Sequence, residues 1–208
     1  MQKLLSLIIV FLLIFLAASC KNENQENNSS KSDNTKNEEV QKSELYRAPK
    51  KALTAEDVAI SKSVMSQIMN ERNLKRFASL IVTAEMATQL TKNDENYTVF
   101  GPSNTALDSL ADKNNKFYSK QENLDKLKDL LKSHIVEGVH SKESLSESIG
   151  KSGKLKLKTL SGTSLTLTKV DDKIIISDNK GVKVKVLQGG EEGSSGTSYV
   201  IGGVLTAD

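Results

Sequence analysis

The segment YTVFGPSNTALDSL, residues 97–110, contains the features of a strand, a corner and the start of a helix. Its aromatic and β-branched residues predict a short strand that directs Val99 and Phe100 into the core. We expect Gly101-Pro102 to end this strand, because proline fixes φ and has no backbone N–H to donate. The pair Ser103-Asn104 then offers side-chain oxygens to the free N–H groups of the next helix. We therefore interpret the segment mainly as a strand-to-helix corner, and less as a ligand contact.

Apolar residues at helical spacing lie on both sides of this corner. Thr54 is suited to cap a helix, and Glu56 and Asp57 fall in its first turn. The inner face of that helix would hold Val58, Ser61, Met65, Ile68 and Met69. A second helix, from near residue 75 to residue 90, would bury Phe77, Leu80, Ile81, Ala84, Ala87 and Leu90. A helical stripe after the corner consists of Leu124, Leu127, Leu130, Leu131, His134 and Ile135.

After Gly150 apolar residues alternate with polar ones, which is the period of a half-buried strand. Strands are predicted near residues 154–158, 164–168, 173–177, 182–186 and 198–205. The Gly-rich run 189–196 is predicted to be a flexible hairpin loop. Helices gathered early and antiparallel strands gathered late predict an α+β fold in one domain.

The N-terminus has the pattern of an export signal. A positive charge precedes an apolar run from Leu4 to Ala18, which is shorter than the roughly 20 residues of a membrane-spanning helix. The small residues Ala17-Ala18-Ser19 before Cys20 resemble a lipobox, although Leu16 stands one place earlier than usual. This resemblance implies that residues 1–19 are a lipoprotein signal peptide and that Cys20 carries fatty acids such as palmitate, which anchor it in the lipid bilayer. The alternative is an ordinary secretory signal with an incidental cysteine.

Residues 20–44 are expected to form the acylated cysteine and a disordered polar tether. The stretch 21–44 is rich in Asn, Glu, Lys and Ser, and Val40 is its one apolar residue. Such a composition cannot bury enough apolar area to offset the entropy of ordering. The tether would hold the domain, residues 45–208, away from a bacterial membrane, which we expect to be the outer membrane. Whether the domain faces the periplasm or the cell surface stays open.

Four segments, in this order, resemble the signatures of fasciclin-like domains. The corner at 97–110 is similar to a Thr-Val-Phe-Ala-Pro-Thr-Asn-x-Ala-Phe pattern, and LLKSHIVEG (130–138) is similar to Leu-Leu-x-Tyr-His-Val-Val-x-Gly. KTLSGTSLTLT (158–168) resembles the family's Thr-Leu-x-Gly-x-x-Leu-x-Val hairpin, and YVIGGVL (199–205) resembles its closing His-Val-Ile-Asp-Gly-Val-Leu. The resemblance covers roughly residues 58–206. It implies a β-wedge of antiparallel strands with helices packed along it, which binds proteins, glycans or other cells.

Some departures from the family pattern concern residues associated with adhesion. Ser133 stands where the Tyr of the Tyr-His pair would be, and in animal members that pair is associated with integrin binding. His134 is retained but falls on an apolar helix face, which favours a hydrogen-bonded core residue over a contact residue. Tyr199 replaces the usual His, and Gly202 replaces the usual Asp. We therefore expect the fold to be kept and integrin-type adhesion to be lost.

Composition and motifs favour a protein that is not an enzyme. The 208 residues include one Cys and two His, too few for a zinc site built mainly from these residues within one chain. The sequence has no Gly-x-Ser-x-Gly elbow, and the run 189–196 carries acids where a phosphate loop needs a Gly-Lys-Ser/Thr ending. His140 and Glu143 could face each other, but two ligands do not make a metal site. We expect no catalytic residue, cofactor or metal.

Alternating lysines mark two of the predicted strands. Lys154, Lys156 and Lys158 project from one face of the first strand, and Lys183 and Lys185 project from one face of the second strand. If these strands are neighbours, they form a basic patch for acidic glycans, lipid headgroups or lipopolysaccharide. The other interpretation is a solvated outer face whose lysines guard a sheet edge. The net charge of only +3 and the 4% of aromatic residues argue against nucleic acid.

The leading hypothesis is a membrane-anchored, non-catalytic adhesion or binding module that recognises proteins or glycans. Its candidate contact residues are His134, His140 and the five lysines named above. The second hypothesis is a carrier of an apolar small molecule such as a carotenoid or lipid, because some fasciclin-like proteins bind pigments. The lack of Trp in the sequence weakens this second hypothesis. The sequence does not indicate the oligomeric state.

Overall fold

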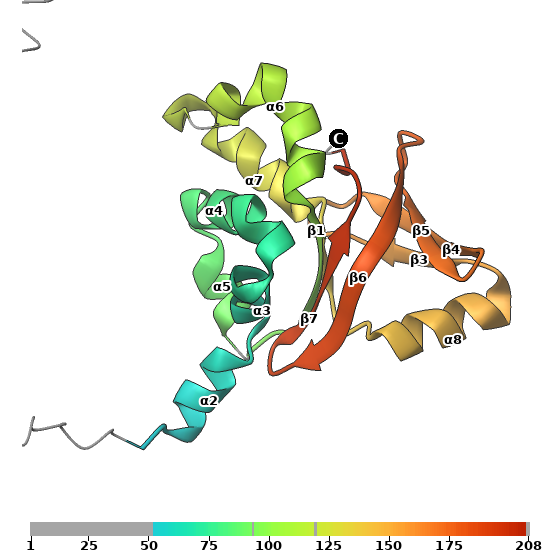
Figure 1. The fold of residues 1–208 in the computed structure, drawn as a ribbon, viewed down its shortest axis with the longest axis horizontal. Helices are drawn as coiled ribbons and strands as arrows, with labels where there is room; N and C mark the ends of the chain where they lie inside the picture. The colour runs from blue at the N-terminus through green and yellow to red at the C-terminus, as the bar shows by residue number, and fades with distance from the viewer. Residues whose placement is uncertain (1–51, 93, 119, 207–208) are drawn as a thin grey trace, which may run out of the picture. The chain divides into compact units, whose positions relative to one another are not determined.

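The computed structural model describes residues 52–92, 94–118 and 120–206 (Figure 1). These residues belong to the compact unit Pro49–Asp208. The signal peptide, Cys20 and the tether lie outside the described residues, so the expectations for them stay predictions. Within the described part of the chain, no helix has both the length and the apolar character needed to cross a bilayer.

The described residues contain a seven-stranded sheet in the order β2-β1-β7-β6-β5-β4-β3. The strands are β1 Tyr97–Pro102, β2 Ile135–Glu137, β3 Leu155–Lys158, β4 Ser164–Val170, β5 Lys173–Ser177, β6 Lys183–Gly193 and β7 Gly196–Ile201. Neighbouring strands are antiparallel except β1 and β7, which run parallel with Tyr97 opposite Gly196. The predicted α+β wedge is confirmed, with one parallel pair where antiparallel strands were expected.

The two edges of the sheet meet at one end. Val136 of β2 and Thr159, just after β3, form an isolated antiparallel bridge. The Leu160 N–H also donates to the Ile135 carbonyl, at 2.8 Å. The sheet therefore curls on itself, and helix α8 (Lys142–Ser152) packs against β3, β4 and β6 beside it (Figure 1).

The other helices precede β2 in the chain. They are α2 Ala55–Ser61, α3 Val64–Asn70, α4 Lys75–Thr83, α5 Ala87–Thr91, α6 Asn104–Tyr118 and α7 Leu124–Lys132, with short 3₁₀ turns at Arg72–Leu74 and Gln121–Asn123. Helices α3 and α6 contact β1, and α7 contacts β2. Helix α2 projects from the body in Figure 1 and buries no residue. It is attached through Ser194, whose hydroxyl donates to the Ala59 carbonyl at 2.6 Å.

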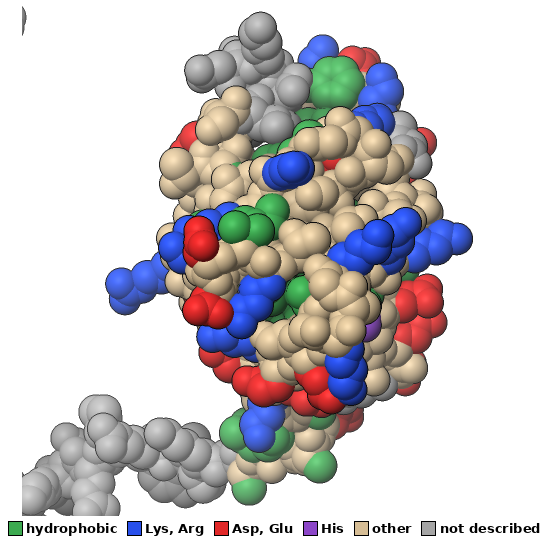
Figure 2. Space-filling model, turned by 90° about the vertical axis from the view of Figure 1, so that its right-hand side faces the viewer, with side chains coloured by type: hydrophobic (Ala, Val, Ile, Leu, Met, Phe, Trp, Pro, Cys, Tyr) green, Lys and Arg blue, Asp and Glu red, His purple; other side chains and the backbone are tan. Residues whose placement is uncertain are grey.

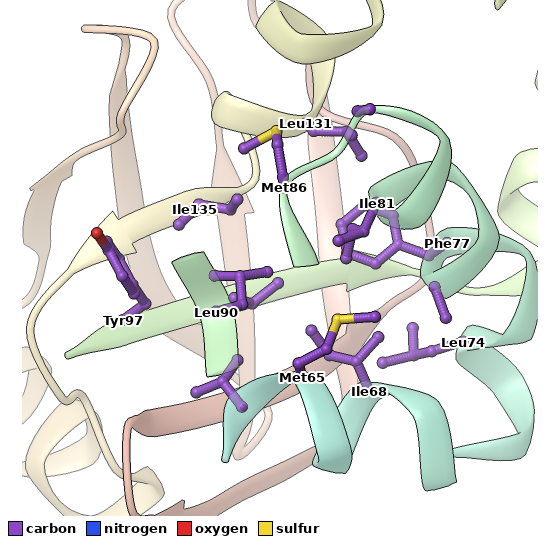
Figure 3. Packing of buried hydrophobic residues seen from close by; sticks show 14 of the residues in the cluster. Met65, Ile68, Leu74, Phe77, Ile81, Met86, Leu90, Tyr97, Leu131 and Ile135 are labelled. Atoms are coloured by element: carbon purple, nitrogen blue, oxygen red, sulfur yellow. The ribbon is translucent and has the colours of Figure 1, made fainter. Parts of the chain in front are cut away.

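Two apolar clusters lie on opposite faces of β1 and β7, so both strands are buried along their whole length. Val99 and Val200 belong to the cluster under the helices, while Phe100 and Tyr199 belong to the cluster with α8. Figure 3 shows the helical cluster, in which Met65, Ile68, Leu74, Phe77, Ile81, Met86, Leu90, Tyr97, Leu131 and Ile135 gather around β1. Consecutive residues Val99 and Phe100 thus enter different cores, as strand alternation requires.

Two of the predicted helices are each divided in two. The first breaks at Lys62-Ser63, where the Ser63 hydroxyl caps α3 by accepting from the Ser66 N–H at 3.2 Å. The second breaks at Glu85, which takes a left-handed conformation with φ of 59°. There the Met86 N–H donates back to the Ile81 carbonyl at 3.0 Å, a Schellman-type helix end. Neither break carries the Gly or Pro that marks a helix end in sequence.

Other boundaries also differ from expectation. Helix α7 ends at Lys132, so His134 lies in a turn and Ile135 begins β2. Strand β1 continues through Pro102 because β2 pairs with it only as far as Val99, so no ladder bond is lost on that side. Helix α8 was not predicted, since its two buried residues, Leu145 and Ile149, are too few to reveal a period.

The Gly-rich run 189–196 is also ordered, where a flexible loop was expected. Strand β6 runs through Gly193 and β7 begins at Gly196, so most of the run is a strand with register shifts and only two residues form the turn. The glycines are needed because this strand passes close to its neighbours. A Cβ on Gly189 would lie 2.3 Å from the Ser198 carbonyl oxygen.

Candidate functional site

His134 is part of the core and is only 1% exposed. Its Nε2 accepts from the Leu205 N–H at 3.0 Å, so the ring proton lies on Nδ1, which is 2.8 Å from the Leu130 carbonyl oxygen. Burial lowers the pKa of His134 to about 4, against the opposing effects of Leu130 and of the Asp178 charge. The side chain fastens the C-terminal segment to the domain and is out of reach of an external ligand. This corrects its place among the candidate contact residues.

His140 is half-buried, and its backbone joins three parts of the fold. Its N–H donates to the Thr98 hydroxyl at 2.9 Å, and its carbonyl accepts from the Tyr199 hydroxyl at 2.7 Å. Burial lowers the pKa of the imidazole, although a hydrogen bond with the Glu137 backbone opposes this. Among the described residues, no group of three or more His, Cys, Asp or Glu is placed to hold a metal ion.

The two lysine strands are not neighbours, because β4 and β5 lie between β3 and β6. The condition on which the basic patch was expected is therefore not met. The register nevertheless places Lys156 and Lys183 in one row across the four strands, on the same outward face. Lys158 shares this face, and Lys154, just before β3, is also exposed.

Lys173 of β5 belongs to the same surface, and sequence reasoning missed it. It lies close to Lys185, whose pKa it lowers by hydrogen bonding and by repulsion between the two ammonium groups. Figure 2 shows the side of the molecule that includes these strands and α8. Lys and Arg side chains project at both margins of that view, while Asp and Glu side chains gather in its lower part.

The residues of the 97–110 corner have structural partners. The Ser103 hydroxyl accepts from the Ala106 N–H at 3.1 Å and so caps α6. The Asn104 side chain accepts from the Arg76 N–H at 3.1 Å and donates to the Arg72 carbonyl at 2.9 Å. These contacts tie the corner to the start of α4. The interpretation of the motif as a folding device agrees with this geometry.

Positions that depart from the family pattern are also used inside the fold. Tyr199 is 1% exposed and stacks on Phe100 with ring centroids 5.3 Å apart. Burial raises the pKa of its hydroxyl, and the charges of Glu143 and Glu191 raise it further. Ser133 is fully buried and donates to the Leu130 carbonyl at 2.6 Å.

Polar groups inside the described domain are paired with one another. Within the described residues, every buried side-chain nitrogen or oxygen has a hydrogen-bond partner. Ser195 is an example: its hydroxyl accepts from the Val64 N–H at 3.0 Å and donates to the Leu90 carbonyl at 3.1 Å. These hydrogen bonds stabilise the fold, and the groups that form them are not available to bind a ligand.

Two hollows of the surface lie on either side of the bulged part of β6. The larger, of about 780 Å³, is bounded by α8, the β4–β5 turn and β6. Its charged lining residues are Lys142, Glu143, Lys169, Asp172, Lys173, Glu191 and Glu192. The other, of about 590 Å³, lies between α3 and β6 and is also lined by Glu191 and Glu192. Linings of this kind do not favour an apolar cargo.

The geometry defines an α+β wedge whose buried polar side chains, including that of Asp178, form hydrogen bonds within the fold. A fasciclin domain profile matches residues 72–207, and the chain belongs to the fasciclin domain family. Fasciclin domains are generally non-catalytic modules of adhesion or binding.

A solved structure of a pair of FAS1 domains, from the insect cell adhesion molecule fasciclin I, has a similar fold. The TM-score is 0.59 and the sequence identity 16%, over 70% of this chain and 51% of the other. The chain thus spans about half the length of that protein, and the likeness concerns the fold alone. No curated protein is significantly similar to the chain in sequence.

Proposed function

We propose that this chain is a binding or adhesion module that recognises proteins or glycans. It is anchored in a bacterial outer membrane through an acylated Cys20. The match of residues 72–207 to the fasciclin domain carries the proposal. The pattern of the first twenty residues supports the anchor, and the polar composition of residues 21–44 suits a spacer. Recognition would take place on the outer surface of the domain.

Attachment of whole cells tests the adhesive role. Cells that lack the protein are compared with cells that carry the wild-type chain, on surfaces coated with matrix proteins or with glycans. We expect weaker attachment without the protein and recovery when the wild-type chain is restored. Unchanged attachment on every coating would count against adhesion.

The anchor needs a separate measurement. Labelling with radioactive palmitate should mark the wild-type chain and leave a Cys20→Ala variant unlabelled, because the variant has no thiol to acylate. The variant should also leave the membrane fraction. Equal labelling of the two chains would show that Cys20 is not the lipidated residue.

A further inference from the structure

The outward face of β3, β4, β5 and β6 is a surface with one sign of charge. Along these strands most apolar residues point inward to the cluster with α8, and the alternate residues point outward. We call the outward set the lysine face; it consists of Lys156, Lys158, Ser164, Thr166, Thr168, Val170, Lys173, Ile175, Ser177, Lys183 and Lys185. It includes five lysines and no acidic residue.

None of the five lysines of this face forms an ion pair with a described Asp or Glu; the ion pair nearest to it in sequence joins Lys169 and Asp172. Lys173 also borders the acid-lined hollow beside α8, whereas the other four lysines of this face are not among its lining residues. Lys173 and Lys185 come close enough to interact although both are cations. A surface that gathers like charges without ion pairs favours an anionic partner.

The lysines border a floor of short side chains. In one row across the sheet, Lys156 lies opposite Thr166, which lies opposite Ser177, which lies opposite Lys183. Three strand spacings separate the two lysines, so their Cα atoms are about 14 Å apart. Between them the side chains of Thr166, Thr168, Ile175 and Ser177 are only half exposed. The result is a strip of hydroxyl-bearing residues along β4 and β5, with the longer lysine side chains of β3 and β6 on either side.

We propose that the lysine face binds a linear acidic polysaccharide, one that carries carboxylate or sulfate groups. The anionic groups would pair with lysines on both borders, and sugar hydroxyls would bond to the threonine and serine hydroxyls of the floor. A polysaccharide chain suits this arrangement better than a lipid surface, because it offers anionic groups for the lysines and hydroxyls for the threonines and serines between them. The proposal rests on the proposed function, since it names the ligand class and the site of that binding module.

Titration of the full chain, purified in detergent, with defined oligosaccharides tests the site. The probes are a heparin octasaccharide, a polygalacturonate octasaccharide and a neutral dextran of similar length. The test variant is Lys156→Gln/Lys183→Gln/Lys185→Gln. The matched control, Lys126→Gln/Lys128→Gln/Lys132→Gln on α7, removes the same charge from another surface. All six residues are at least partly exposed, so both variants should fold, which circular dichroism checks.

We expect at least one acidic probe to bind the wild-type chain and dextran not to bind. The test variant should lose about ten-fold or more in affinity, and the control should stay within about two-fold. Equal losses in both variants would show a general charge effect and overturn the site. Binding of phosphatidylglycerol vesicles, lost in the test variant, with no binding of either acidic probe would show a lipid surface instead. If the test variant loses probe binding but cells that carry it attach as well as wild type, the lysine face binds the polysaccharide but does not mediate attachment. The proposed adhesion would then use another surface of the domain.

Discussion

His134 and Asp178 hold the last described residues against the domain. His134 accepts from the Leu205 N–H at 3.0 Å, and the Asp178 carboxylate accepts from the N–H and the hydroxyl of Thr206 at 3.1 and 2.7 Å. Burial works to raise the pKa of Asp178, but hydrogen bonds from Thr206 and from the β5–β6 turn outweigh it and lower the pKa. His134 therefore binds the C-terminal segment as the neutral imidazole, and Asp178 binds it as the carboxylate.

The first prediction is that acid weakens this attachment through His134. The pKa of His134 is about 4 in the folded protein instead of 6.5, so below pH 6.5 the unfolded chain takes up a proton that the folded chain does not. The stabilisation is complete above pH 6.5 and decreases as the pH falls toward 4. About 3 kcal/mol of the free energy of unfolding should be lost over this range. Urea unfolding at a series of pH values measures it.

A His134→Gln variant isolates this contribution. The glutamine amide can still donate and accept hydrogen bonds, but it does not titrate. The variant should be less stable than wild type near neutral pH, and the difference should shrink as the pH falls toward 4. If the difference were the same at every pH, His134 would not be the group responsible.

At the scale of elements, strand β7 begins at a glycine because its backbone touches β1. At Gly196 φ is +127°, and a Cβ would lie 1.8 Å from the Tyr97 carbonyl oxygen. Gly196→Ala must therefore push β7 away from its parallel neighbour. We expect a loss of more than about 3 kcal/mol in the free energy of unfolding, or failure to fold. Thermal unfolding followed by circular dichroism measures this.

Gly150→Ala in α8 is the matched control. A Cβ there has no atom within 4 Å, and alanine is a better helix former than glycine. This control should be as stable as wild type or up to about 1 kcal/mol more stable. Wild-type stability of Gly196→Ala would mean that β1 and β7 do not pair as described.

The elements differ in how far local sequence determines them. The alternation of LKLK in β3 and SLTLT in β4 predicts both strands and their buried faces, because each strand has one inner and one outer side. The breaks at Ser63 and Glu85 were not predicted, since a serine cap and a left-handed glutamate define them and neither break carries Gly or Pro. The position of β7 between β1 and β6 also depends on long-range packing.

Local sequence likewise predicts only part of the lysine face. The sequence predicts which side of each strand its lysines occupy, and Lys156 and Lys183 do lie outward. It does not give the order of the strands, so the distance between the two sets of lysines was unknown. Lys173 was missed for that reason: its cationic neighbour Lys185 is on the adjacent strand, β6.

In the described domain as a whole, the central strands are much more buried than the N-terminal helix α2. Strands β1 and β7 lie between the two apolar clusters and are buried throughout. Helix α2 buries no residue, and Val58 and Ile60 are exposed. Segments with few buried contacts open locally, whereas central strands open only when the domain unfolds.

Hydrogen exchange should therefore rank these segments in a fixed order. Helices α2 and α3 have seven residues each, but α3 buries Val64, Met65 and Ile68, so the two form an internal comparison. Amides of α2 should exchange at least about a thousand-fold faster than those of β1 and β7, which exchange through global unfolding. Amides of α3 should fall between these limits. Mass spectrometry of exchanged peptides measures the rates, and protection of α2 equal to that of α3 would mean that something covers α2 in solution.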